Sequence, residues 1–158
     1  MRRARISVSL LLGSFFGAAM VAASFAYFNY KFSEYKFIDF NEWIFYEKQT
    51  IFTPDQERYI VVFYSSKVAG TYEKLQDANA SLPIIAIYYY QQSFENSKST
   101  KSLRSGTNTT LKFIQRFNIY KSPTVFIIKK VKDKLYKQDS MIRELDTLDK
   151  ISTKINAL

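Results

Sequence analysis

The chain has no cysteine and no histidine, and only four glycines and three prolines among its 158 residues. Without cysteine there is no thiolate for disulfide exchange, and without cysteine and histidine the usual zinc ligands are missing. The absence of histidine also removes the commonest general base and the Ser-His-Asp triad. So few glycines leave no Gly-rich phosphate loop. We therefore expect a protein that is not an enzyme and has no metal or cofactor site.

Acidic residues are also in the minority, with 14 Asp and Glu against 23 Lys and Arg, so that the formal net charge is +9. A basic chain favours acidic partners, which include nucleic acid, anionic head groups, cell-wall polymer and acidic proteins. The N-terminal sequence narrows this list of partners, because it predicts that the rest of the chain is exported from the cytoplasm. An exported domain does not meet nucleic acid, so we expect no nucleic-acid partner.

Charged side chains are absent from residues 6–30, which follow Arg2, Arg3 and Arg5. This stretch exceeds the ~18–20 apolar residues that cross a hydrocarbon core. An aromatic belt closes it, formed by Tyr27, Phe28 and Tyr30. Arginines before the span place the N-terminus in the cytoplasm. The stretch therefore predicts a single-pass anchor in a bacterial inner membrane.

A cleaved signal peptide is the alternative, because Ser24-Phe25-Ala26 fits a small-x-small cleavage site. The apolar run is longer than the roughly 7–15 residues of a signal peptide, which favours an uncleaved anchor. We predict that residues 1–5 are cytoplasmic and that 31–57 form a juxtamembrane segment with a first helix. Residues 58–158 then form the periplasmic domain.

The exported part alternates apolar strands with amphipathic helices. Residues 31–38 fit either a continuation of the membrane helix or a short strand. Asp39 and Glu42 form a capping box that predicts a helix over 39–48. Strands are expected where apolar, β-branched and aromatic residues run together, at 58–65, 82–90, 124–128 and 135–138.

Further helices are expected at 68–79, 111–118 and 139–158. Thr109 or Thr110 caps the second, with Leu111, Ile114 and Phe117 facing inward, and Asp139 or Ser140 caps the last. A lysine-rich hairpin turn is expected at 129–134. Residues 91–110 are polar and Ser/Thr/Lys-rich, which predicts a functional or mobile insertion outside the core. Together these elements predict an α/β sandwich.

Residues 58–75, 82–92, 111–138 and 139–158 resemble successive parts of the thioredoxin family. The most specific piece is Phe117-Asn-Ile-Tyr-Lys-Ser-Pro-Thr-Val-Phe126, which is similar to the family's pattern before and after its Pro-Thr pair. The resemblance implies a thioredoxin-like sandwich with a cis bond between Ser122 and Pro123. It also implies that Ser122, Pro123 and Thr124 help to hold an extended peptide.

The resemblance places Val68, Ala69, Gly70 and Thr71 where the family carries Cys-x-x-Cys. Thiol–disulfide exchange needs a thiolate, which none of these residues supplies. The expected domain is therefore redox-inactive, and this small apolar loop becomes a candidate contact with another protein.

Three other features are candidate sites. Tyr88 and Tyr90 are expected on one face of the strand end, as core and rim or as a tyrosine-lined protein contact. Lys129, Lys130 and Lys132 either protect a sheet edge or dock an acidic partner or a membrane. Asn79-Ala-Ser81, with Asp77 before it, is a candidate N-glycosylation site, and Asn108-Thr-Thr110 is a second sequon.

We expect a non-enzymatic interaction or scaffold subunit of a bacterial envelope assembly, for example a flagellar motor, a secretion machine or a respiratory-complex assembly. One alternative is a periplasmic holdase that binds extended peptides at the groove beside Pro123. Another is an enzyme that uses Ser65, Ser66 or Thr71.

Overall fold

The computed structural model describes residues 7–34, 37–65, 71–76, 80–90 and 94–145. The chain divides into two compact units, Met1–Tyr35 and Lys36–Leu158. Val68, Ala69 and Gly70 of the predicted partner-contact loop, and Asn79 of the predicted sequon, lie outside the described residues.

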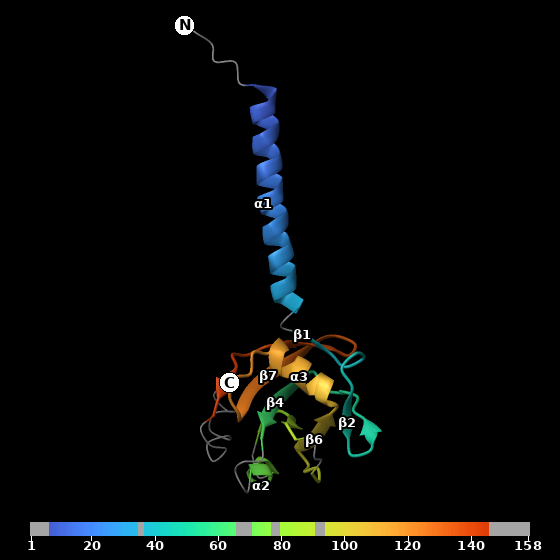
Figure 1. Ribbon diagram of the computed structural model, residues 1–158. Helices are drawn as coiled ribbons and strands as arrows, with labels where there is room; N and C mark the ends of the chain where they lie inside the picture. The colour runs from blue at the N-terminus through green and yellow to red at the C-terminus, as the bar shows by residue number, and fades with distance from the viewer. Residues whose placement is uncertain (1–6, 35–36, 66–70, 77–79, 91–93, 146–158) are drawn as a thin grey trace. The chain divides into compact units, whose positions relative to one another are not determined.

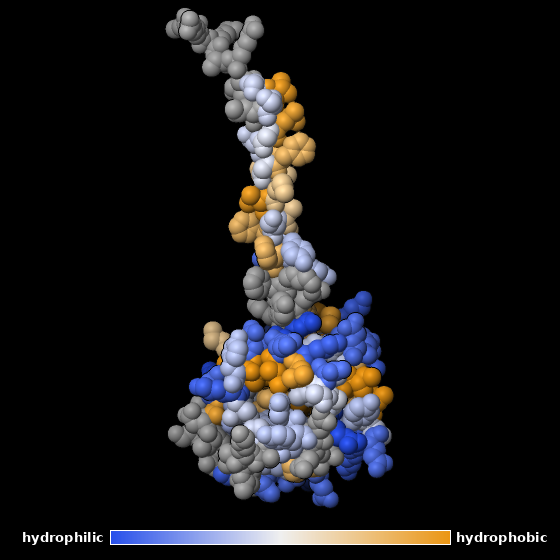
Figure 2. All heavy atoms as spheres, in the orientation of Figure 1, coloured by the Kyte–Doolittle hydropathy of each residue, from blue (hydrophilic) through white to orange (hydrophobic). Residues whose placement is uncertain are grey.

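The first unit is the helix α1, Val8–Glu34. Its stretch Leu12–Tyr30 is long and apolar enough to cross a membrane. Bulky apolar side chains along it are exposed, among them Phe15, Met20 and Phe25, and they give the helix its hydrophobic colouring in Figure 2. The two expectations for residues 31–38 are both met in part, because α1 continues to Glu34 and strand β1 begins at Phe37.

In its described residues, the second unit consists of a curled mixed sheet and two short helices (Figure 1). The strands lie in the order β1-β8-β7-β4-β5-β6-β2-β3, and β9 pairs with β7. Strand β4 is parallel to β5 and antiparallel to β7, and β5 is parallel to β6. The strands are β1 Phe37–Asp39, β2 Phe45–Glu47, β3 Thr50–Ile51, β4 Arg58–Tyr64, β5 Ile84–Tyr88, β6 Thr100–Ser105, β7 Thr124–Lys132, β8 Leu135–Gln138 and β9 Arg143–Glu144.

The central strands β4 and β5 are buried on both faces, as their continuous apolar runs predict. On one face α3, Thr107–Arg116, packs with Phe113 and Phe117 against Phe63 and Phe126. The opposite face is covered in part by α2, Thr71–Gln76, whose buried side chains are Tyr72 and Leu75. Figure 1 shows α3 crossing β7 and β4.

The helix expected over 39–48 is wrong. Asp39 instead forms a turn, in which its Oδ1 accepts a hydrogen bond from the Asn41 amide at 2.8 Å and its carbonyl accepts one from the Trp43 amide. The chain then extends into β2, where Phe45 pairs with Ser105 of β6 and is fully buried. The same residues that fit a capping box fit an Asp-initiated turn, and burial of Phe45 in the sheet decides between them.

The interpretation of residues 91–110 as an insertion outside the core is also wrong, because β6 lies inside the sheet between β5 and β2. Its Thr100, Ser102 and Ser105 are buried, and each hydroxyl has a partner. Thr100 donates to the Leu75 carbonyl at 3.1 Å, Ser102 accepts from the Phe94 amide at 3.1 Å, and Ser105 bonds Thr110 at 2.7 Å. These hydrogen bonds, made in part with residues distant in the sequence, offset the cost of burying a polar strand.

The predicted helix orientation at 111–118 needs correction. α3 begins at Thr107 with Gly106 as its N-cap, so neither Thr109 nor Thr110 is the cap. Leu111 is 46% exposed, whereas Phe113 is buried in the core. Phe117 faces inward as predicted, and Ile114 packs against the core.

The start of the expected last helix is wrong as well. Asp139 and Ser140 cap no helix, because the amide of Asp139 donates to the Ile127 carbonyl and the Ser140 Oγ accepts from the Ile127 amide, both at 2.8 Å. Strand β9 follows and pairs with Thr124 and Val125. Residues 146–158 lie outside the described part of the chain. The hairpin turn is shorter than expected, since β7 continues to Lys132.

Candidate functional site

The ends of two parallel strands place a pair of tyrosines on the surface. β4 and β5 end side by side at Tyr64 and Tyr88, and the Tyr89 amide donates to the Tyr64 carbonyl at 2.9 Å. Here the alternation of the strand stops and the chain turns. Tyr89 and Tyr90 are therefore 40% and 50% exposed. The carboxyl ends of parallel strands are the usual position for a binding site in an α/β sheet.

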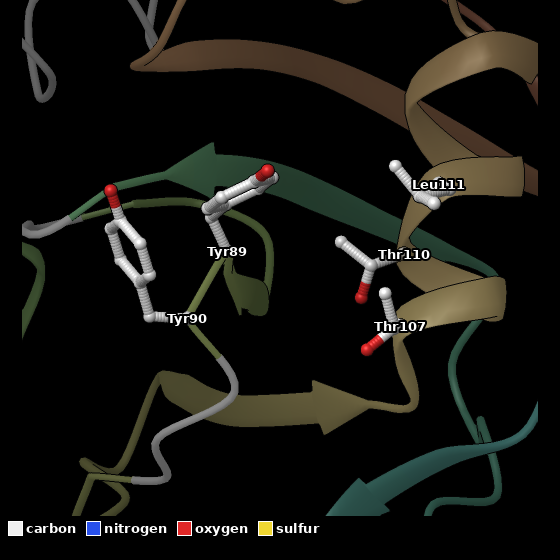
Figure 3. Close-up of a pocket in the computed structure, with 5 residues that line it drawn as sticks. All are labelled: Tyr89, Tyr90, Thr107, Thr110 and Leu111. Carbon is white, nitrogen blue, oxygen red and sulfur yellow. The ribbon is translucent and has the colours of Figure 1, made fainter.

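A first cavity of about 240 Å³ separates these tyrosines from α3. Figure 3 shows Tyr89 and Tyr90 on one side and Thr107, Thr110 and Leu111 on the other, with Tyr89 extending toward the helix. The position of Leu111 explains its exposure, because it faces this hollow rather than the core.

A second cavity of about 340 Å³ shares Tyr89 and Tyr90 with the first. It extends toward the loop before β7 and is lined in addition by Phe63, Ser65, Ile114, Ile119, Tyr120, Lys121 and Ser122. We call the two adjoining cavities the tyrosine groove. Tyr120, at 84% exposed, stands at its rim.

The groove combines aromatic walls with hydroxyl groups and one cation. Among the lining residues that the structure describes, none is a carboxylate, and the lysine, Lys121, lies 3.3 Å from Glu144. The Thr110 hydroxyl is hydrogen-bonded to the Ser105 hydroxyl. A few polar groups within an apolar lining are typical of sites that bind by shape and orient their ligand by hydrogen bonds.

The predicted residues beside the proline are at one end of the groove. The Ser122–Pro123 peptide bond is cis, as the thioredoxin resemblance implies. Ser122 lines the second cavity, and the Thr124 hydroxyl donates to the Lys121 carbonyl. The Pro123 carbonyl accepts a hydrogen bond from the Leu145 amide at 2.8 Å. Of the loop predicted to contact a partner, Thr71 is the first residue of α2, and 68–70 lie outside the described residues.

Of the two alternatives for Tyr88 and Tyr90, the structure matches core and rim, because Tyr88 is buried in the core at 2% exposure whereas Tyr90 is half exposed. The strand ends at Tyr88, so alternation does not extend to Tyr90. Sequence reasoning therefore missed Tyr89, Leu111 and Tyr120 as groove residues. The turn after β5 puts Tyr89 at the surface, and Tyr120, in the loop before Pro123, has no periodic pattern to mark it.

The predicted lysines lie elsewhere. Lys129 and Lys132 are exposed and Lys130 is half-buried, all on β7. Strand β7 pairs with β4 on one side and with β8 on the other, and β8 is covered in turn by β1. Lys129, which pairs with Arg58 and Lys137, is therefore in the interior of the sheet, and protection of an edge does not account for it. Lys130 and Lys132 lie beyond the last pair of the β4–β7 register.

The catalytic alternative has few groups to draw on. Ser65 lines the second cavity, whose lining offers it neither an imidazole nor a carboxylate as base. The carboxylate of Asp55, which could act as a base elsewhere in the domain, has a structural role, because it accepts a hydrogen bond from the Tyr59 hydroxyl at 2.6 Å. Among the described residues, no three His, Cys, Asp or Glu side chains gather as metal ligands would.

In comparisons by sequence, no protein-family model and no curated protein matches this chain.

Proposed function

We propose that this protein is a membrane-anchored, non-enzymatic binding subunit of a bacterial envelope assembly, and that the tyrosine groove receives its partner. The observation that carries the proposal is the exposure of Tyr89, Tyr90, Leu111 and Tyr120 around two adjoining cavities. Tyrosines of this kind supply much of the binding energy of protein interfaces, because they bury a large apolar surface with few rotatable bonds.

The partner that fits the groove is a protein segment with an apolar side chain for the cavities and an acidic group near Lys121. The cavity volumes suit one or two side chains rather than a large cofactor. Lys121 is the charged group in the described lining, and an acidic group of the partner would share or displace its exposed ion pair with Glu144 at 3.3 Å. Without Arg2, Arg3 and Arg5, which we place in the cytoplasm, the formal net charge of the rest of the chain is 9 − 3 = +6, and it acts in the same direction at longer range.

A thioredoxin-like, redox-inactive fold is part of the proposal. It is supported by the strand order β5-β4-β7-β8, by β4 and β5 being parallel with β7 and β8 antiparallel, and by the cis bond before Pro123. The absence of cysteine supports loss of the redox reaction. The chain departs from the family frame by adding β6, β2 and β3 beside β5.

The anchor is the second part of the proposal. We assign α1 as a single span with a cytoplasmic N-terminus, from its apolar length and from the arginines that precede it. Tethering raises the local concentration of the domain near other membrane proteins, so that a modest groove affinity is sufficient.

Affinity purification of the full chain from solubilised native membranes tests the proposal. We expect one partner at a fixed ratio with the wild type, and loss of that partner from the double variant Tyr90→Ala/Tyr120→Ala. The matched control is Val131→Ala/Met141→Ala, which also removes two exposed apolar side chains, 55% and 83% exposed, but none from the groove.

Two outcomes would contradict the proposal. A partner that stays bound to the Tyr90→Ala/Tyr120→Ala variant would show that the groove is not the interface. Many clients in small, variable amounts would instead support the holdase, for which the groove beside Pro123 is the observation in favour.

A further inference from the structure

A row of four side chains, three of them basic, crosses four strands at the opposite end of β4 from the groove. Phe37 of β1 pairs with Lys137 of β8, Lys137 with Lys129 of β7, and Lys129 with Arg58 of β4. Directly paired residues project from the same face of a sheet, so these four side chains stand next to one another. We call them the basic row.

The basic row is unfavourable for the isolated domain. Lys129 and Lys137 are directly opposite each other, and like charges in this position destabilise a sheet. Within the described part of the chain, Arg58 has an ion-pair partner, Asp139 at 3.0 Å, whereas no carboxylate pairs with Lys129 or Lys137. The Lys137 ammonium instead lies 5.8 Å from the centre of the Phe37 ring. A local conflict of this kind points to a role outside the domain's own stability.

Chain connectivity limits the distance between the candidate span and Phe37, which is one end of the basic row. Phe37 follows Tyr30, the last residue of the candidate span, by only seven residues. Four of these continue α1 at ~1.5 Å each, and the other three could add at most ~10 Å even at full extension, so Phe37 lies within about 16 Å of the span. This bound holds for any angle between the helix and the domain. The interfacial head groups begin where the span ends.

We propose that the basic row binds the anionic head groups of the membrane that α1 spans. The lipid is favoured over an acidic protein because the chain itself delivers the row to the lipid surface, and because Phe37 beside the lysines suits the interface between head groups and acyl chains. The inference rests on the anchor proposed above, but not on the tyrosine groove.

Binding through the row would also orient the domain. Along β4, Arg58 and Tyr64 are at opposite ends of the strand, a separation of about 20 Å at the usual rise per residue. With the basic row against the head groups, the tyrosine groove at the other end of β4 faces away from the bilayer. The groove is then open to a partner protein rather than to lipid.

The absence of cysteine gives a direct test, because Val131→Cys introduces a unique labelling site two residues beyond Lys129 on β7. The full chain is reconstituted in bilayers of phosphatidylcholine, with or without phosphatidylglycerol, and energy transfer is measured from the labelled site to acceptors on the lipid head groups. We expect greater transfer with phosphatidylglycerol, and loss of the increase at high salt.

Removing the two charges by Lys129→Gln/Lys137→Gln should abolish the response to phosphatidylglycerol. The matched control is Lys74→Gln/Lys112→Gln, which removes two charges from α2 and α3 and should keep it. Two results from a chain that has inserted into the bilayer would overturn the inference. One is equal energy transfer with and without phosphatidylglycerol, and the other is an equal loss of the phosphatidylglycerol response in both double variants. A chain that fails to insert would overturn the anchor and this inference together.

Discussion

The rings of Tyr89 and Tyr90 are almost perpendicular, at 86°, with their centroids 5.0 Å apart. The Tyr89 ring also makes a T-shaped contact with the Phe63 ring, with the two centroids 6.2 Å apart, which connects the exposed pair to the core. This packing holds two exposed aromatic side chains in place before any partner arrives. A preformed aromatic surface loses less conformational entropy on binding than a mobile one.

Replacing Tyr90 by alanine should weaken partner binding by at least about 2 kcal/mol, or roughly thirtyfold, because a central tyrosine of an interface commonly carries that much. The domain itself should lose little stability, since the Tyr90 side chain is half exposed. Titration of the purified partner, with thermal unfolding of the same variant, measures both quantities. Unchanged affinity in a folded Tyr90→Ala variant would exclude this residue from the interface.

The buried hydrogen bond between Ser105 and Thr110 should make a measurable contribution to stability. Thr110→Val leaves the Ser105 hydroxyl buried without its partner, which costs about 1–3 kcal/mol. Adding Ser105→Ala should restore part of that loss, because the double variant buries no unpaired hydroxyl. Chemical unfolding of the two single variants and the double variant measures the coupling. Strictly additive losses would contradict it.

Acid should weaken the link between Asp55 and Tyr59. The hydrogen bond from the Tyr59 hydroxyl, together with the nearby Lys101, holds the pKa of Asp55 below its usual 3.8, despite an opposing effect of burial. A carboxyl group with a lowered pKa stabilises the fold above its unfolded-state pKa, and this contribution disappears as the pH falls through the lower, folded-state value. The stability difference between wild type and Tyr59→Phe should therefore shrink as the pH drops below 3.8.

Tyr136→Phe provides the control for this experiment. Its hydroxyl donates to the Gln56 carbonyl at 2.6 Å, an acceptor that does not titrate, and burial raises the pKa of Tyr136 to about 12. The loss of stability in Tyr136→Phe should stay constant over the same pH range. A Tyr59→Phe difference that stays equally constant would show that the Asp55 bond makes no pH-dependent contribution.

The paired lysines of the basic row should lower the stability of the domain. Lys129→Gln removes the repulsion from Lys137, so we expect the free energy of unfolding to rise by about 0.2–1 kcal/mol at low salt, with a smaller gain at high salt. Lys132→Gln is the control, because Lys132 is paired with Leu135 rather than with another lysine. Equal effects of the two substitutions would mean that the opposed charges are already screened.

Sequence reasoning predicted the elements whose signal is hydrophobic. The continuous apolar runs of β4, β5 and β7 identified buried central strands, and the uncharged stretch 6–30 identified α1. These patterns are reliable because burial on both faces of a strand, or in a bilayer, demands apolar residues at nearly every position.

The elements that were missed depend on tertiary partners. Strand β6 has the composition of a loop, and only the hydrogen bonds of Thr100, Ser102 and Ser105 make its burial possible. The turn at Asp39 has the same local signature as a helix cap until Phe45 enters the sheet. The groove was found only in part, since the exposure of Tyr89 and Leu111 follows from where β5 ends and where α3 begins.

Site-specific photocrosslinking in native membranes tests the groove most directly. A photoreactive amino acid replaces Tyr120 or Leu111, which line the groove, and Lys112 or Met141, which do not, although all four are exposed. We predict one discrete crosslinked protein from each groove position and none from the two control positions. Crosslinks to that protein from Lys112 and Met141 but not from Tyr120 and Leu111 would contradict the assignment of the groove as the partner site.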